Sequence, residues 1–219
     1  KFFLKINGKM TNEWNSLNII SENASTVGSF DLGLYKTKDG SNEILKDLEN
    51  HKFEVVYLLG ADNLKFKKNN EFIIYQGSHG DKGAEMADII LPGAAYTEQN
   101  GYFTNLEGKL QKAFKASYPP EEAKEDWQII NELAEAMNHR KLFNDKDELD
   151  SSLLNQINLY LEKDTSIKSS NAENLKFDKE ILNIINDDYY YSNVVARASK
   201  TMFECKNAKT KFKSTGTEG

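Results

Sequence analysis

The chain has 219 residues, a formal net charge of −6 and only two arginines, Arg140 and Arg197, among its 28 basic residues. Proteins that bind nucleic acids usually present arginine forks on a basic surface, so this composition argues against that class. The single cysteine, Cys205, excludes an intrachain disulfide and any zinc or iron–sulfur site held by thiolates of this chain.

Hydrophobic residues make up 39% of the chain, which is sufficient for a folded core. The mean hydropathy of −0.65 is nevertheless low, and we expect the C-terminal third to contribute least to that core. No apolar run approaches the roughly 20 residues that a helix needs to cross a bilayer. The sequence therefore predicts no direct membrane span, and any membrane association is expected to come through partners.

The first predicted element is an amphipathic helix over residues 12–26, which Gly28 is expected to end. Residues 30–38 are expected to form a loop or an edge segment. The apolar positions of the helix that share one face are Trp14, Leu17, Ile20 and Ala24.

Helical spacing returns over residues 43–50, through Ile44, Leu45 and Leu48, and the strongly apolar residues 53–59 then predict a buried strand. A helix that leads into a buried strand ending at a glycine turn is typical of an α/β unit.

Two further short strands are predicted over residues 72–75 and 89–91, with Gly77, Gly80 and Gly83 between them. Both runs are apolar throughout rather than alternating. This pattern predicts strands that are buried on both faces, as in a parallel sheet covered by helices.

Residues 101–114 predict a hairpin or an extended excursion, because the extended run 102–104 and the return run 109–114 flank a turn at residues 105–108. Pro119 and Pro120 then interrupt the chain. The clearest predicted helix covers residues 121–138, and the residues on its apolar face are Ala123, Trp127, Ile130, Leu133, Ala134 and Met137.

The character of the chain changes at residue 141. The sequence predicts an amphipathic helix over residues 149–161, a polar loop over 163–174, a brief apolar helix over 177–185 and a mobile lysine-rich tail from 206. Before the tail, Val194, Val195, Ala198 and Met202 fit one face of another helix. We therefore predict an α/β domain over residues 1–140 and a helical or irregular extension over residues 141–219.

The glycine loop is the first candidate for a ligand site. Glycines that follow a strand let backbone N–H groups approach a phosphate at the start of a helix. The spacing of Gly77, Gly80 and Gly83 does not match GxGxxG, however, and Asp88 follows before a long helix can develop. We favour a tight strand-to-helix turn without a ligand over a phosphate site.

The other polar candidates have simpler explanations. His79 and Asp81 fall short of the three or four ligands of a protein metal site, and no nucleophile or acid–base partner stands beside Glu98 and Glu107. Trp127 belongs to the core by its periodicity. No partner at a supporting spacing exists for His51, His139 and Cys205. The sequence predicts no catalytic, cofactor-binding or metal-binding residue.

Tyr189, Tyr190 and Tyr191 form an aromatic cluster in an otherwise polar region. No local core is expected to bury these rings. We interpret them as a surface that docks onto another subunit.

One long stretch resembles a known family. The residues YQGSHGDKGAEMADIILPGAAYTEQNGYFTNLEGKLQ, 75–111, are similar to the C-terminal part of the 75 kDa iron–sulfur subunit family of respiratory complex I. The runs ADIILP and AAYTEQNGYFTNLEGKLQ resemble the molybdopterin oxidoreductase superfamily as a whole. HGDKGAEMAD, DWQIINELAEAM and ARASKTMFEC narrow the resemblance to the complex I subunit. With NEWNSLNIISENASTVGSFDLGL and VVYLLGADN, the resemblance covers about residues 12–137 and 187–206.

This resemblance implies part of a molybdopterin-oxidoreductase-like domain, with a parallel sheet flanked by helices. In that family the N-terminal half of the subunit carries iron–sulfur clusters, and the C-terminal half keeps the fold without a molybdenum cofactor. No cluster-binding motif is present here. The resemblance therefore implies no cofactor in this chain, with iron–sulfur clusters and FMN in partner subunits. Either the subunit is split between two polypeptides or the chain is a piece of a longer one.

The function implied is structural. The chain is expected in the peripheral arm of NADH:ubiquinone oxidoreductase, on the matrix side of the mitochondrial inner membrane, among other subunits of that arm. There it is expected to brace the chain that carries the N-terminal iron–sulfur part, and to dock with that chain edge to edge because half a domain cannot close its own sheet. Two alternatives stay open: an active molybdopterin-type fragment that holds a pterin dinucleotide with residues 60–63 and 77–83, and a free-standing nucleotide-binding domain.

Overall fold

The computed structural model describes residues 7–8, 20–21, 23–34, 41–64, 66–162 and 188–211, and its contacts group them into two compact units. Unit 1 comprises residues 1–40, 100–114 and 141–181; unit 2 comprises residues 41–99, 115–140 and 182–219. The two units thus interleave along the chain. The predicted division between residues 140 and 141 follows a change in composition and stays a prediction.

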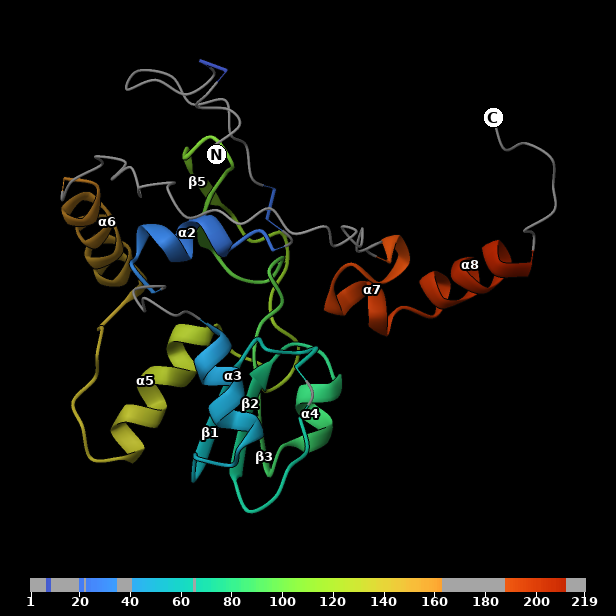
Figure 1. Ribbon diagram of the computed structural model, residues 1–219. Helices are drawn as coiled ribbons and strands as arrows, with labels where there is room; N and C mark the ends of the chain where they lie inside the picture. The colour runs from blue at the N-terminus through green and yellow to red at the C-terminus, as the bar shows by residue number, and fades with distance from the viewer. Residues whose placement is uncertain are drawn as a thin grey trace. The chain divides into compact units, whose positions relative to one another are not determined.

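Unit 2 is built on a three-stranded parallel sheet of β1 (Val55–Leu59), β2 (Phe72–Gly77) and β3 (Ile89–Pro92), in the order β1-β2-β3 (Figure 1). The β1–β2 ladder starts with Val55 opposite Phe72, and the β2–β3 ladder starts with Ile74 opposite Ile89. β-branched and aromatic residues dominate these strands, as a pleated sheet favours. The α/β fold and the parallel sheet predicted from the sequence are confirmed.

One face of the sheet carries the main core. Leu58, Ile73 and Tyr75 are buried there, and partly buried Ala84 and Met86 of the short helix α4 (Lys82–Met86) pack against them. The register explains this grouping, because Leu58 lies opposite Tyr75 and side chains of paired residues point to the same face. Deep burial of such apolar side chains contributes about 1.5–3 kcal/mol each.

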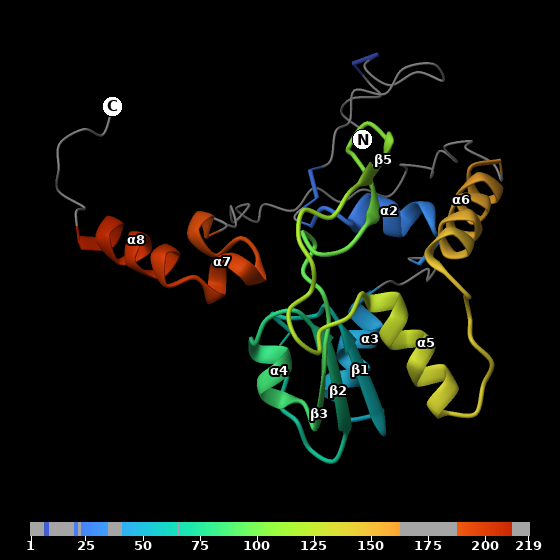
Figure 2. The ribbon, with the colours of Figure 1, turned by 180° about the vertical axis from the view of Figure 1, so that it is seen from behind.

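The other face is held by a polar contact with α5 (Asp126–Ala136). Gln76 is fully buried, its Nε2 donates to Asp126 Oδ1 at 2.7 Å, and its Oε1 accepts from the Tyr57 hydroxyl. α4 and α5 lie on opposite sides of the sheet in both ribbon views (Figures 1 and 2). The helix α3 (Ser41–Glu49) adds the buried Leu48 to unit 2.

Burial on both faces was predicted for the strands at residues 72–75 and 89–91, and the strand at residues 53–59 was predicted to be buried; both predictions are wrong for several positions. Val55 and Leu59 in β1 are 59% and 52% exposed, and Phe72 and Ile89 are 43% and 44% exposed. The sheet is only three strands wide among the described residues, so its edges and strand ends extend beyond the helices that cover its centre.

α5 is shorter than predicted and begins five residues later. Residues 121–125 are not helical: Ala94 N donates to Lys124 O at 2.8 Å, and Glu121 has a φ of 48°. Gln128 Oε1 accepts from Glu125 N at 3.2 Å and so caps the start of the helix. Ile129 and Asn131 are its buried residues, while Met137, which the predicted apolar face included, is exposed.

In its described residues, unit 1 contains a β-hairpin and two helices. The strands β4 (Gly101–Thr104) and β5 (Leu110–Ala113) pair antiparallel, with α2 (Thr26–Asp31) and α6 (Lys146–Glu162) in the same unit. Asn105 Oδ1 accepts from Glu107 N and Lys109 N, and Gly108 has a φ of 82°, which an L side chain rarely adopts. The predicted hairpin is confirmed, and α6 begins three residues before its predicted start.

The first helix differs from its prediction. Gly28 was expected to end a helix, but it lies inside α2, and Gly33, with a φ of 69°, lies just beyond the end of this helix. Thr104 Oγ1 donates to Asp31 Oδ2 at 2.7 Å and fastens α2 to β4. Most of the predicted helix over residues 12–26 lies outside the described residues, as do the predicted loop 163–174 and helix 177–185.

The C-terminal segment forms three short elements instead of one predicted helix. These are the 3-10 turn η1 (Tyr189–Tyr191), α7 (Val194–Ala198) and α8 (Lys200–Lys211). Ser199 is extended, with a ψ of 120°, and separates α7 from α8. Residues 206–211, which the sequence placed in a mobile tail, are helical, and the rest of that predicted tail lies outside the described residues.

The ion pairs of Asp150 provide a test of unit 1. Its carboxylate lies 2.9 Å from Lys112 Nζ of β5 and 3.2 Å from Lys146 Nζ of α6. Burial alone would raise the pKa of Asp150, but the hydrogen bonds and charges of both lysines hold that pKa below its usual value. Stability from this carboxylate is therefore present above the ordinary aspartate pKa of about 3.9 and is lost as the pH falls through the lower folded value.

We expect Asp150→Asn to lower the free energy of unfolding by about 2 kcal/mol at pH 7, because two lysines lose their charged partner. The difference from the parent chain should vanish at the acid end of a series of urea unfolding curves. Asp147→Asn, an exposed change on the same helix, is the control and should cost only a few tenths of a kcal/mol. Identical urea midpoints for Asp150→Asn and the parent at pH 7 would contradict the assignment.

Candidate functional site

The candidate site is the loop from Gly77 to Gly83, between the carboxyl end of β2 and the start of α4. Ligands of open α/β sheets bind at this end of the strands. The turn of residues 60–63 that follows β1 lies beside it, because Gly83 N donates to Asp62 O at 2.9 Å and Lys82 Nζ donates to Asn63 Oδ1 at 3.1 Å. The structure thus brings together the two segments that the sequence offered for a pterin dinucleotide.

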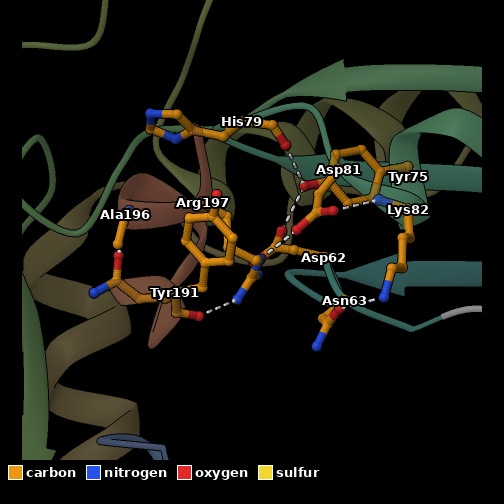
Figure 3. Close-up of polar contacts among 10 residues, drawn as sticks. Asp62, Asn63, Tyr75, His79, Asp81, Lys82, Tyr191, Ala196 and Arg197 are labelled. Atoms are coloured by element: carbon orange, nitrogen blue, oxygen red, sulfur yellow. Dashed lines mark hydrogen bonds and ion pairs between the residues drawn. The ribbon is translucent and has the colours of Figure 1, made fainter. Parts of the chain in front are cut away.

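The space within this loop is filled by Tyr75. Its ring is fully buried, and its hydroxyl lies 2.5 Å from Asp62 Oδ1 and 2.8 Å from the carbonyl oxygen of His79, both of which can accept its proton (Figure 3). Burial first, and then the Asp62 carboxylate, raise the pKa of Tyr75 above its usual value. The hydroxyl is therefore a neutral donor at physiological pH.

Two of the loop glycines are required by this tyrosine and by the neighbouring backbone. A Cβ on Gly77 would lie 2.2 Å from the Tyr75 hydroxyl oxygen, and a Cβ on Gly83 would lie 2.8 Å from the carbonyl oxygen of Ala61. Gly80 has open space around it. Glycines in a phosphate loop let the backbone approach a ligand, whereas Gly77 and Gly83 let it approach Tyr75 and Ala61. This supports the tight turn that the sequence favoured.

The C-terminal segment reaches the same loop through an ion pair. Arg197 of α7 donates from Nε to Asp81 Oδ2 at 2.5 Å, and one of its terminal nitrogens lies 3.4 Å from the carbonyl oxygen of Tyr191 (Figure 3). Only 22% of the Arg197 side chain and 17% of the Asp81 side chain are exposed. Asp81 also caps α4 by accepting from Lys82 N at 2.8 Å. Sequence reasoning missed this pair, since its members are 116 positions apart.

The remaining candidates are not assembled into a reactive group. His79 Nδ1 lies 2.9 Å from Ser78 Oγ, as expected for a hydrogen-bonded loop histidine. Glu98 Oε2 accepts from Ala95 N, while Glu107 lies in the exposed hairpin turn of unit 1. Cys205 is exposed on α8. Within the described ranges, no three His, Cys, Asp or Glu side chains are arranged to hold a metal ion.

Two expectations about single residues need revision. His51 was given no partner, but its Nδ1 lies 2.5 Å from Oε1 of the buried Glu71. The aromatic cluster also has local contacts: Lys206 Nζ lies 4.1 Å from the Tyr191 ring centroid, and Tyr189 and Tyr190 meet edge to face. Tyr189 alone of the three is largely exposed. Docking of this cluster onto another subunit stays a prediction.

The charges around the loop do not fit a pterin dinucleotide. Its pyrophosphate requires free hydrogen-bond donors or positive charge, but Lys82 of the loop bonds to Asn63, and the carboxylates of Asp62 and Asp81 lie close by. A cavity of about 360 Å³ beside the loop is lined by Glu98, Glu121 and Glu122 and, counting its described lining residues, by no lysine or arginine. Arg197, the one arginine at the loop, is already paired with Asp81.

The packing of Gly83 can be tested with a matched pair of loop variants. Gly83→Ala forces a methyl group against the backbone of Ala61, so we expect a loss of about 2 kcal/mol in the free energy of unfolding, measured by urea denaturation. Gly80→Ala, where an added Cβ meets nothing, should change it by less than about 0.5 kcal/mol. Equal losses in the two variants would mean that the loop does not close on Tyr75 as described.

The Arg197–Asp81 ion pair can be tested by how well it protects the C-terminal segment, residues 188–211, from proteolysis. Arg197→Ala should weaken docking of residues 188–211 by about 2 kcal/mol, roughly thirtyfold, and speed their cleavage in limited proteolysis accordingly. Arg140→Ala removes the other, exposed arginine and should leave the cleavage rate unchanged.

Burial raises the pKa of Asp81, but Arg197 and Lys82 outweigh it, so the pKa lies below its usual value. Docking should therefore persist from pH 7 to 5 and weaken below about pH 4.

Comparison with known proteins places the fold in a family. The family model for molybdopterin oxidoreductase matches residues 2–136. The NADH-ubiquinone oxidoreductase 75 kDa subunit of Reclinomonas americana is 38% identical over 204 residues, which cover 89% of this chain and 29% of that protein. A subunit of the NADH-quinone oxidoreductase of Rickettsia bellii is 40% identical over 211 residues, which cover 94% of this chain and 30% of the bacterial protein.

A mitochondrial relative shows the same relation: the NADH-ubiquinone oxidoreductase 78 kDa subunit of Candida albicans is 36% identical over 210 residues, covering 88% of this chain and 28% of the relative. This chain thus spans less than a third of the length of each of these relatives. Coverage of 94% includes most of residues 141–186, where sequence reasoning found no resemblance. The chain belongs to the molybdopterin oxidoreductase family and is homologous to about 30% of the complex I 75 kDa subunit.

Proposed function

We propose that the chain is a structural part of the peripheral arm of NADH:ubiquinone oxidoreductase and holds no redox centre of its own. In this role it braces the chain that carries the iron–sulfur part of the 75 kDa-type subunit while electrons pass from NADH to ubiquinone. The observation that carries the proposal is the 38–40% identity to NADH oxidoreductase subunits over about nine-tenths of the chain. The chain spans less than a third of the length of those subunits.

The chemistry of the chain supports a role without a redox centre. Its single cysteine, Cys205, cannot hold an iron–sulfur cluster alone. The loop at the carboxyl end of β2 is occupied by Tyr75 and bordered by carboxylates, which is unfavourable for an anionic cofactor. The clusters and FMN are accordingly assigned to partner subunits.

The proposed location is the matrix side of the mitochondrial inner membrane, in contact with other peripheral-arm subunits. Relatives include proteins whose names describe them as mitochondrial NADH-ubiquinone oxidoreductase subunits. Among the described residues, no helix has the length and apolar character required to traverse a membrane. We propose that attachment to the membrane runs through the other subunits of the complex.

A second candidate is a fragment of an active molybdopterin-type oxidoreductase. The family match and the position of the loop at the carboxyl ends of the strands favour it. The glutamates that line the cavity beside the loop, and the pairing of Arg197 with Asp81, argue against it. We therefore rank it below the structural role.

The two candidates make opposite predictions for purified material. We expect the chain to migrate with NADH dehydrogenase activity on a native gel of solubilised mitochondrial membranes. After dissociation from the complex, the folded chain should contain no iron, flavin, molybdenum or tungsten by elemental analysis and absorbance. Molybdenum or tungsten at one equivalent per chain would reverse the ranking, and migration away from NADH dehydrogenase activity would exclude the structural role.

A further inference from the structure

We draw no further inference here: the strongest candidate, the cavity of about 360 Å³ beside the loop at the carboxyl end of β2, is lined by the acidic cluster of Glu98, Glu121 and Glu122, and in the described part of the chain no buried unpaired side chain points into it to indicate a ligand.

Discussion

The burial of one tyrosine sets the arrangement of unit 2. Tyr75 stands at the end of the central strand with its ring in the core and its hydroxyl between Asp62 and the backbone of His79. A buried aromatic ring contributes a large apolar area, and its hydroxyl requires a partner once it is removed from water. The turn after β1, the loop after β2 and the start of α4 all close around this side chain. Gly77 and Gly83 are the positions where the closure leaves no room for a Cβ.

The closure around Tyr75 occupies the place where a fold of this kind usually binds a ligand. The carboxyl end of a parallel sheet is the usual place for a ligand, and the family model is named for a cofactor enzyme. Yet the backbone that would approach an anion approaches Tyr75 instead, and Asp81 turns its carboxylate toward Arg197. The fold of the chain therefore does not by itself define a function, and the loop contacts the C-terminal segment through the Asp81–Arg197 pair.

Local patterns predicted the regular elements well, because strand composition, turn chemistry and helical spacing are short-range signals. The apolar runs that became β1, β2 and β3, the hairpin turn at Asn105 and the helix α6 were all recognisable. The choice between two glycines was harder: Gly33, rather than Gly28, has the positive φ at the end of α2. The presence of a glycine does not reveal its φ angle. Gly28 and Gly33 lie close together in the same short segment, so either could have ended the helix.

The periodicity of the sequence could not predict long-range contacts. The pairs Arg197–Asp81 and His51–Glu71 join residues that no helical or strand spacing relates. Exposure was misjudged for a different reason. Val55 and Leu59 have the composition of a buried strand, but no described element covers them. Of the site, sequence motifs therefore predicted the loop and its tight turn, and the tertiary contacts of Asp81 came only from the structure.

The interleaving of the two units bears on how the chain acquires its structure during synthesis. The sheet strands of unit 2 leave the ribosome before the hairpin and α6 of unit 1, but Arg197 is added long after both. The ion pair of Asp81 can therefore form only after Arg197, 116 positions downstream, has been synthesised. The contacts of the sheet alone do not complete unit 2. Contacts of such large sequence separation slow folding, because the intervening chain must first be ordered. The last folding step of unit 2 is therefore expected to occur only after Arg197 has been synthesised.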